Sequence, residues 1–115
     1  MSRQPTNLLP QVSFSILLAL SLKPRHGYEI MQQVELDSNG VIKLGPGALY
    51  GSIKHLNDDN LIEEMPFQDD TRRKYYRLTK KGYDRLEAEI KYMEQTVQIA
   101  QKRQLLPQKL SIIYG

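Results

Sequence analysis

The sequence contains no cysteine and no tryptophan, and it has only two histidines, His26 and His55, among 115 residues. The absence of cysteine excludes disulfides, thiolate nucleophiles and cysteine-ligated zinc or iron–sulfur centres. Two histidines far apart in the chain leave few ligands for a metal, so we expect no metal and no cofactor. A chain of this length builds a small core, and association with a second copy is the stabilising device that remains.

Long apolar runs are also scarce. The most apolar stretch, residues 12–22, is shorter than the roughly 20 residues that a membrane span needs. A signal peptide is the alternative, since Ala19-Leu20-Ser21 resembles a cleavage site. However, Arg3 is the only positive residue before the stretch, which runs directly into folded-domain sequence. We therefore expect a buried first helix and a cytoplasmic protein.

Catalytic signatures are missing as well. The chain has no HExxH motif, no phosphate-binding P-loop and no Gly-x-Ser-x-Gly motif. Gly45, Gly47 and Gly51 miss the dinucleotide-binding fingerprint by one residue, and no βαβ pattern surrounds them. We interpret His26, at a helix start, as a turn or capping residue and His55 as an exposed polar side chain. We predict no catalytic residue and no enzymatic activity.

Charge is unevenly distributed along the chain. The net charge of +3 comes from 16 basic and 13 acidic residues. Residues 1–40 hold three of each sign, whereas residues 71–85 hold seven basic side chains against a single acidic one, Asp84. Such a local excess suits an anionic partner such as a nucleic acid. A plain solvated face is the alternative.

Apolar spacing and turn residues predict four helices and one β-hairpin. We expect a flexible arm at 1–9, helices at 10–22 and 27–37 with a turn at 25–27 between them, and a short extended piece at 41–44. A third helix begins at Gly45-Pro46. Strands follow at 61–67 and 74–79 around a charged tip, with Pro66 indicating an edge strand. Thr79 caps a last helix at 80–105.

The third helix has two different sides. Its predicted core side is formed by Leu49, Ile53 and Leu56. The opposite side holds Gly47, Tyr50, Gly51 and Lys54. Glycine weakens a helix by up to about 1 kcal/mol relative to alanine. Two glycines on one side therefore suggest that something large approaches the backbone there, and the alternative is that both simply lie near the helix start.

The last helix carries a heptad pattern. Its apolar residues recur at steps of three and four: Tyr83, Leu86, Ile90, Met93, Val97 and Ala100. At a rise of 1.5 Å per residue this helix is about 39 Å long, more than a small domain covers. The pattern predicts dimerisation through a helix of a second copy. Packing on its own domain is the alternative.

The order helix–helix–helix–hairpin–helix is typical of a winged helix-turn-helix, a mostly α fold with a small β-hairpin. In that arrangement the third helix enters the major groove and the hairpin is the wing. Residues 10–79 would form the DNA-binding domain, 80–106 a C-terminal dimerisation helix and 107–115 an apolar tail. The predicted DNA contacts are Tyr28, Gly47, Tyr50, Gly51 and Lys54, with Arg72, Arg73 and Lys74 from the wing. A protein-interaction module without specific DNA binding is the alternative.

Three motifs resemble those of PadR-like transcriptional regulators, in the same order. They are Pro24-Arg25-His26-Gly27-Tyr28-Glu29-Ile30, the stretch from Gly47 to Leu56, and Leu61-Ile62-Glu63 with the stretch from Arg73 to Gly82. The resemblance covers about residues 10–100. It implies a homodimeric repressor of the branch with a single C-terminal helix, whose two wing domains hold a pseudo-palindromic operator.

The resemblance also bears on ligands. Some family members release DNA when phenolic acids or lipophilic cationic drugs bind, which implies a small hydrophobic or aromatic effector. Some drug-sensing members stack such ligands on a tryptophan pair, and this chain has no tryptophan. Stacking would have to fall to Phe14, Tyr92 or Tyr114.

Overall fold

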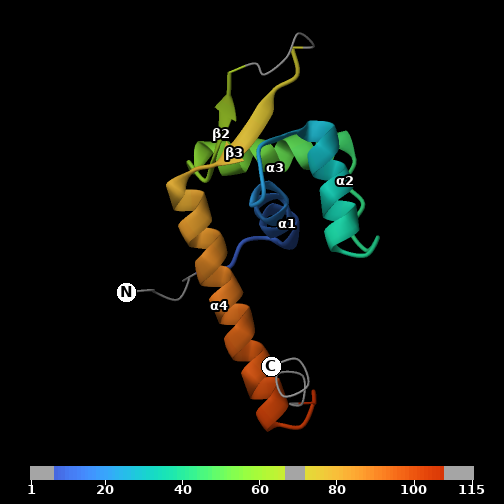
Figure 1. The fold of residues 1–115 in the computed structure, drawn as a ribbon, viewed down its shortest axis with the longest axis vertical. Helices are drawn as coiled ribbons and strands as arrows, with labels where there is room; N and C mark the ends of the chain where they lie inside the picture. Colours follow the sequence, from blue (N-terminus) through green and yellow to red (C-terminus); the bar gives the residue numbers. More distant parts are fainter. Residues whose placement is uncertain (1–6, 67–71, 108–115) are drawn as a thin grey trace.

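The computed structural model describes residues 7–66 and 72–107. Along the chain lie α1 (Gln11–Leu20), β1 (Arg25–His26), α2 (Gly27–Asp37), α3 (Pro46–Asp58), β2 (Ile62–Met65), β3 (Tyr75–Leu78) and α4 (Lys80–Lys102) (Figure 1). The four predicted helices and the hairpin are confirmed, each within a few residues of its expected bounds. The residues described include no helix with both the length and the apolar composition of a membrane span.

The sheet has three strands, not the two that we predicted. All neighbours are antiparallel, in the order β1-β3-β2, and Arg25 pairs with Tyr76 while His26 pairs with Tyr75. The predicted turn at 25–27 was therefore wrong, because two residues are too few to show the alternation of a strand. The strand β2 is an edge strand, as the position of Pro66 predicts. Residues 41–44 form no strand.

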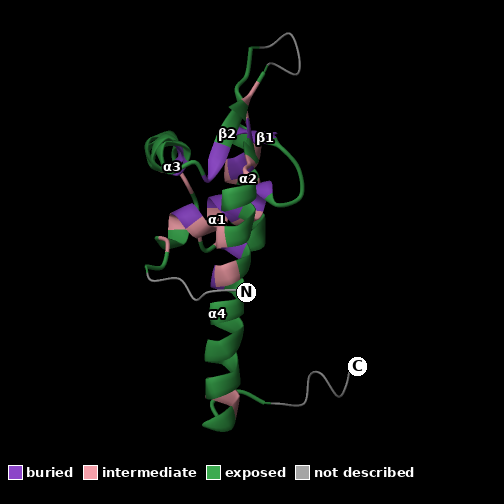
Figure 2. Cartoon of the chain, turned by 90° about the vertical axis from the view of Figure 1, so that its left-hand side faces the viewer, coloured by how far each residue is buried: buried purple, intermediate pink, exposed green. Residues whose placement is uncertain are grey.

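The core is centred on α1. Ile16 and Leu17 of α1 are fully buried, and the predicted core side of α3 is at most 5% exposed. Figure 2 shows the buried residues gathered where α1, the sheet and the first turns of α4 meet. Arg25 lies in this core because its Nε donates a hydrogen bond to the carbonyl oxygen of Ala19 at 2.8 Å. This bond fixes the end of α1 against β1.

The first turn of α4 contains a position, Gly82, where only glycine fits. Thr79 caps it as predicted, its Oγ1 accepting a hydrogen bond from the backbone N–H of Gly82 at 3.0 Å. A Cβ atom at Gly82 would lie 1.9 Å from the carbonyl oxygen of Leu61. That oxygen also accepts from the Thr79 N–H at 3.1 Å. The close approach sets the direction in which α4 leaves the hairpin.

Most of α4 extends away from the domain (Figure 1). Leu86 is 4% exposed and belongs to the core, whereas every residue from Ile90 to Ile99 is exposed. The molecule is consequently elongated, 52 Å along its longest axis. The residues from Ile90 to Ile99 are covered only in part by the described residues of their own chain.

Candidate nucleic-acid interface

The outer side of α3 is open, as predicted. Gly47, Tyr50, Gly51 and Lys54 are all exposed. A Cβ atom at Gly47 or at Gly51 would meet nothing within 4 Å, so packing inside the chain does not require glycine at either position. Lys54 forms an ion pair with Asp58 one turn later, at 3.0 Å, and such an exposed pair is weak enough to be exchanged for another anion.

Tyr50 leans against the start of α2. The Cβ atom of a residue larger than glycine at position 27 would lie 2.4 Å from the Tyr50 hydroxyl oxygen. Gly27 therefore lets Tyr50 approach the backbone beside Tyr28, whose side chain is 61% exposed. We did not predict a site role for Gly27. The signal was available, since a glycine at the first position of a helix is seldom chosen for helix stability.

His26 is the capping residue that the sequence indicated. Its backbone N–H donates to Oε1 of Glu29 at 3.2 Å, and its Nδ1 lies 3.4 Å from the backbone N of Glu29. The imidazole also reaches the wing, because Nε2 lies 2.7 Å from Nη1 of Arg73. The link between helix and wing was not expected from the sequence. His55, by contrast, is exposed as predicted.

The basic stretch is partly balanced within the chain. Arg77 pairs with Glu63 at 2.7 Å, and Lys80 pairs with Asp84 at 3.0 Å. The wing prediction concerns Arg72, Arg73 and Lys74, all of which are exposed just before β3. Arg72 has φ 62°, in the left-handed region. The rest of the predicted tip, residues 68–71, lies outside the described residues.

A cleft of about 420 Å³ joins the two parts of this surface. It is lined by His26, Gly27, Tyr28, Tyr50, Arg73, Lys74 and Tyr76. Four of the eight predicted DNA contacts therefore surround one cleft, while Gly47, Gly51, Lys54 and Arg72 are not among its lining residues. Burial raises the pKa of the Tyr76 phenol above 10.0, with smaller contributions from Glu64 and Tyr50. Tyr76 consequently stays neutral at physiological pH.

The predicted dimerisation residues fall into two groups. Tyr83 is 53% exposed, and Ile90, Met93 and Val97 are each 43% exposed, while Ala100 is half-buried. Leu86 is the exception. Because it is already buried in the core of its own chain, it has little surface left for a partner.

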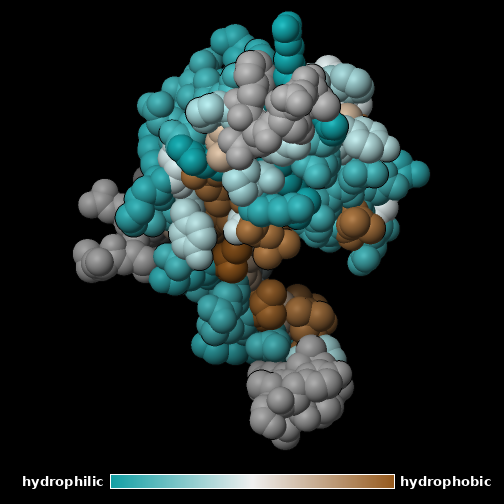
Figure 3. Space-filling model, turned by 45° about the horizontal axis from the view of Figure 1, so that its top comes forward, coloured by the Kyte–Doolittle hydropathy of each residue, from teal (hydrophilic) through white to brown (hydrophobic). Residues whose placement is uncertain are grey.

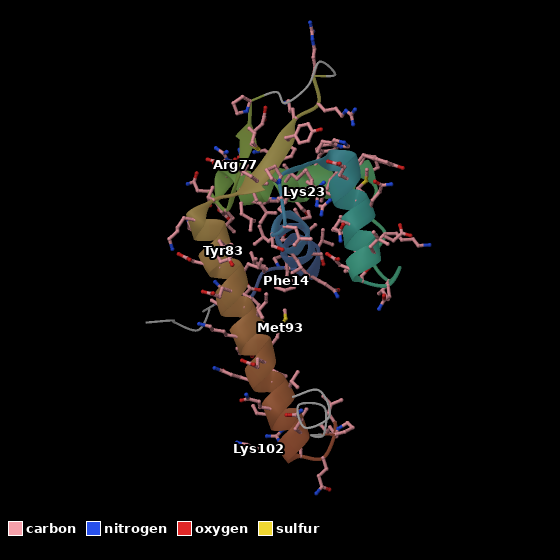
Figure 4. All side chains as sticks on the ribbon, in the orientation of Figure 1. Phe14, Lys23, Arg77, Tyr83, Met93 and Lys102 are labelled. Atoms are coloured by element: carbon pink, nitrogen blue, oxygen red, sulfur yellow. The ribbon has the colours of Figure 1, made fainter. Side chains whose placement is uncertain are left out.

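A groove of about 590 Å³ lies between α1, the end of α2 and α4. Phe14 and Leu18 line one side of it, and Tyr92, Met93 and Val97 line the other. Figure 4 labels Phe14 on α1 and Met93 on α4, which both line this groove, and Figure 3 shows apolar side chains gathered beside a hollow between the domain and α4. Two of the three aromatic side chains named for ligand stacking thus line one groove. Tyr114 lies outside the described residues.

The family model of the transcriptional regulator PadR-like family matches residues 16–88. The chain belongs to this family. The match includes every residue that lines the cleft and the start of α4, and it ends before the exposed residues from Ile90 to Ile99. An uncharacterised protein X from Lysinibacillus sphaericus is 37% identical over 71 residues, which are 59% of this chain and 65% of that protein. The chain spans less than two thirds of the length of the curated relatives that it matches.

Solved structures of PadR-like proteins share the fold. A PadR family transcription regulator from Clostridium difficile is similar at a TM-score of 0.69 and 26% identity, over 81% of this chain and 97% of that one. Bacillus subtilis PadR, solved in complex with operator DNA, is similar at a TM-score of 0.62 and 22% identity, over 70% of this chain and 47% of that one. The second similarity concerns the fold alone.

One charged residue of this PadR-like chain has a position that the heptad pattern did not predict. Glu89 is 1% exposed, and its Oε2 accepts hydrogen bonds from the backbone N–H of Leu9 at 3.0 Å and from Nε of Arg85 at 2.8 Å. Arg85 in turn donates to the carbonyl oxygen of Asn7. The pair fastens residues 7–9 to α4, next to the groove.

Proposed function

We propose that this PadR-like chain is a sequence-specific DNA-binding repressor that acts as a homodimer on a pseudo-palindromic operator. The observation that carries the proposal is the surface shared by α3 and the wing. An open helix side with two glycines stands beside a cleft lined by Arg73 and Lys74. The operator complex of Bacillus subtilis PadR, a protein of similar fold, supports the assignment.

The outer side of α3 enters the major groove. Gly47 and Gly51 let the helix backbone approach the base pairs, and Lys54 exchanges its pair with Asp58 for a phosphate or a base edge. The Tyr28 and Tyr50 hydroxyls and the cations of the wing hold the sugar–phosphate backbone. The wing then fixes the orientation of α3, while α3 supplies the sequence preference.

The second copy covers the exposed part of α4. Tyr83, Ile90 and Val97 are seven residues apart and form one stripe along the helix, and all three are exposed. Met93 lies on the neighbouring stripe, at the edge of the groove. A two-fold symmetric pairing along these two stripes would match the two-fold symmetry of an inverted repeat in DNA.

Selection of bound sequences from random DNA tests the proposal. The expected result is an inverted repeat with half-sites about one helical turn apart. The double variant Arg72→Ala/Arg73→Ala should weaken binding to every sequence and flatten the slope of log K against log salt by about 0.9 per lost phosphate contact. Lys102→Ala, a loss of charge at the far end of α4, is the control. Failure to enrich any sequence would favour the protein-interaction module.

An effector site is a second proposal, carried by the groove. Phe14 and Tyr92 offer two aromatic faces on its opposite walls, which suits a small hydrophobic or aromatic ligand. Thermal shift with phenolic acids and aromatic cations tests it. A rise in the melting temperature that Tyr92→Ala abolishes would support an effector at this groove, and no rise with either class would contradict it.

A further inference from the structure

His26 lies between the helix-turn-helix and the wing. It is the last residue of β1 and the N-cap of α2, and its side chain is 8% exposed. Its ring packs edge-on against Tyr75, with centroids 5.3 Å apart and planes at 82°. Because β1 pairs with β3 at these two residues, the imidazole is held firmly at the root of the wing.

The contact between His26 and Arg73 determines the state of the ring. A guanidinium has only donors, so at 2.7 Å the Nε2 lone pair accepts from Nη1 of Arg73. The ring proton of the neutral imidazole then lies on Nδ1, which cannot accept from the Glu29 N–H in that tautomer. The Nδ1–N separation is the longer one, 3.4 Å. The Glu29 carboxylate still caps α2 through the backbone N–H of His26.

We infer that His26 is a positioning residue for DNA binding: its Nε2 holds the guanidinium of Arg73 at the mouth of the cleft. A phosphate that passes Tyr28 and Tyr50 then meets a cation already in place. The guanidinium has five donors in a rigid fork, so one can bind His26 while others bind the phosphate. This inference rests on the proposed function and adds a residue that does not itself touch DNA.

The size of the effect follows from ordering one long side chain. The contact with His26 restricts the rotamers of the Arg73 side chain before a phosphate binds, so it lowers the cost of ordering that side chain. Removing the contact should therefore weaken DNA binding about two- to tenfold. The charge of Arg73 is kept, so the salt slope should not change.

His26→Asn separates this role from capping. Asparagine is among the best N-cap residues, but its side chain is too short to keep the contact with Arg73. We expect His26→Asn to keep the cap of α2, to lower the melting temperature through the lost packing against Tyr75, and to bind a labelled mixed-sequence duplex two- to tenfold more weakly. Arg73→Ala should cost less in the His26→Asn background than in the wild type. Unchanged or tighter duplex binding by His26→Asn would overturn the inference. So would a double variant whose loss of affinity equals the product of the losses in the two single variants.

A measurement without DNA tests the contact itself. The ¹⁵N resonance of His26 Nε2 should be that of an unprotonated nitrogen and should move in Arg73→Ala. This resonance reports on the ring of the wild-type protein, so it tests the contact with Arg73 even where His26→Asn lowers the melting temperature. A protonated Nε2 would overturn the inference. Wild-type protein that binds no duplex would overturn the proposed function, whereas wild-type binding with His26→Asn unchanged would overturn this inference alone.

Discussion

The substitution Gly82→Ala should destabilise the fold strongly although it adds one methyl group. The new Cβ would lie 1.9 Å from the carbonyl oxygen of Leu61 and 2.8 Å from its carbonyl carbon. Backbone atoms cannot rotate away as a side chain can. The oxygen is also held in place by the Thr79 N–H at 3.1 Å, so relief requires that α4 move away from the hairpin.

The expected magnitude is a balance of two effects. Overpacking costs about 1–3 kcal/mol and the upper end applies to a rigid neighbour, while alanine improves helix propensity by up to about 1 kcal/mol. The net loss in the free energy of unfolding is about 2 kcal/mol. In a domain of this size that lowers the melting temperature by roughly 8–16 °C.

Gly51→Ala is the matched control, since the same change at the open side of α3 meets nothing within 4 Å. It should raise the free energy of unfolding by about 0.5–1 kcal/mol. Urea denaturation followed by circular dichroism, at one protein concentration, measures both variants. A Gly82→Ala protein within about 0.5 kcal/mol of the wild type would refute the close approach of α4 to Leu61.

Two further predictions concern the cleft. Gly27→Ala should displace the Tyr50 side chain, because the new Cβ would lie 2.4 Å from the Tyr50 hydroxyl oxygen, at the end of a flexible side chain. The affinity for a DNA duplex should fall with little change in the melting temperature. An affinity equal to that of the wild type would contradict the role of Tyr50. The pKa of Tyr76 is raised on folding, so the folded state keeps its proton longer and stability should fall as pH rises past about 10. Tyr76→Phe should show a weaker loss over that range in alkaline melts, and an identical loss would contradict the assignment.

The helices were predictable because each has its own local signal. Pro46 at the first position of α3, with three apolar residues on one side, predicted both its start and its buried face. Thr79 predicted the start of α4 in the same way. Such signals need only neighbouring residues, since hydrogen bonding and apolar spacing within a helix repeat over a few positions.

The strand β1 and the role of His26 were not predictable from the sequence. Both depend on β3, which lies some 50 residues later and supplies Tyr75 and the adjoining Arg73. A two-residue strand is too short to show an alternating pattern in the sequence. The sequence around a histidine at a helix start also carries no signal for a contact with a distant arginine. Contacts between distant segments set these features, and only the structure shows which segments meet.

The heptad pattern of α4 predicted the exposed part of the helix better than its first turns. Position 86 faces the domain, and position 89, outside the pattern, is buried because Arg85 and the Leu9 N–H satisfy its carboxylate. A glutamate in a helix is normally an exposed residue. The spacing of apolar residues predicts neither the hydrogen bond from the Leu9 N–H nor the burial of Glu89 that this bond permits.

The two exposed stripes of α4 are too small to hold a dimer alone. Tyr83 is 53% exposed and Ile90, Met93 and Val97 are each 43% exposed, so burying the remainder in both subunits gives about 5–11 kcal/mol. Association costs about 4–15 kcal/mol, which leaves little or no affinity.

A stable dimer therefore needs the groove beside the stripe, including Phe14 of α1. Phe14→Ala should dissociate the dimer at least as readily as Val97→Ala in sedimentation experiments, with Leu36→Ala, an exposed residue outside the groove, as control. A dimer unaffected by Phe14→Ala would mean that α4 pairs without the groove, and the energy of association would then have to come from another surface.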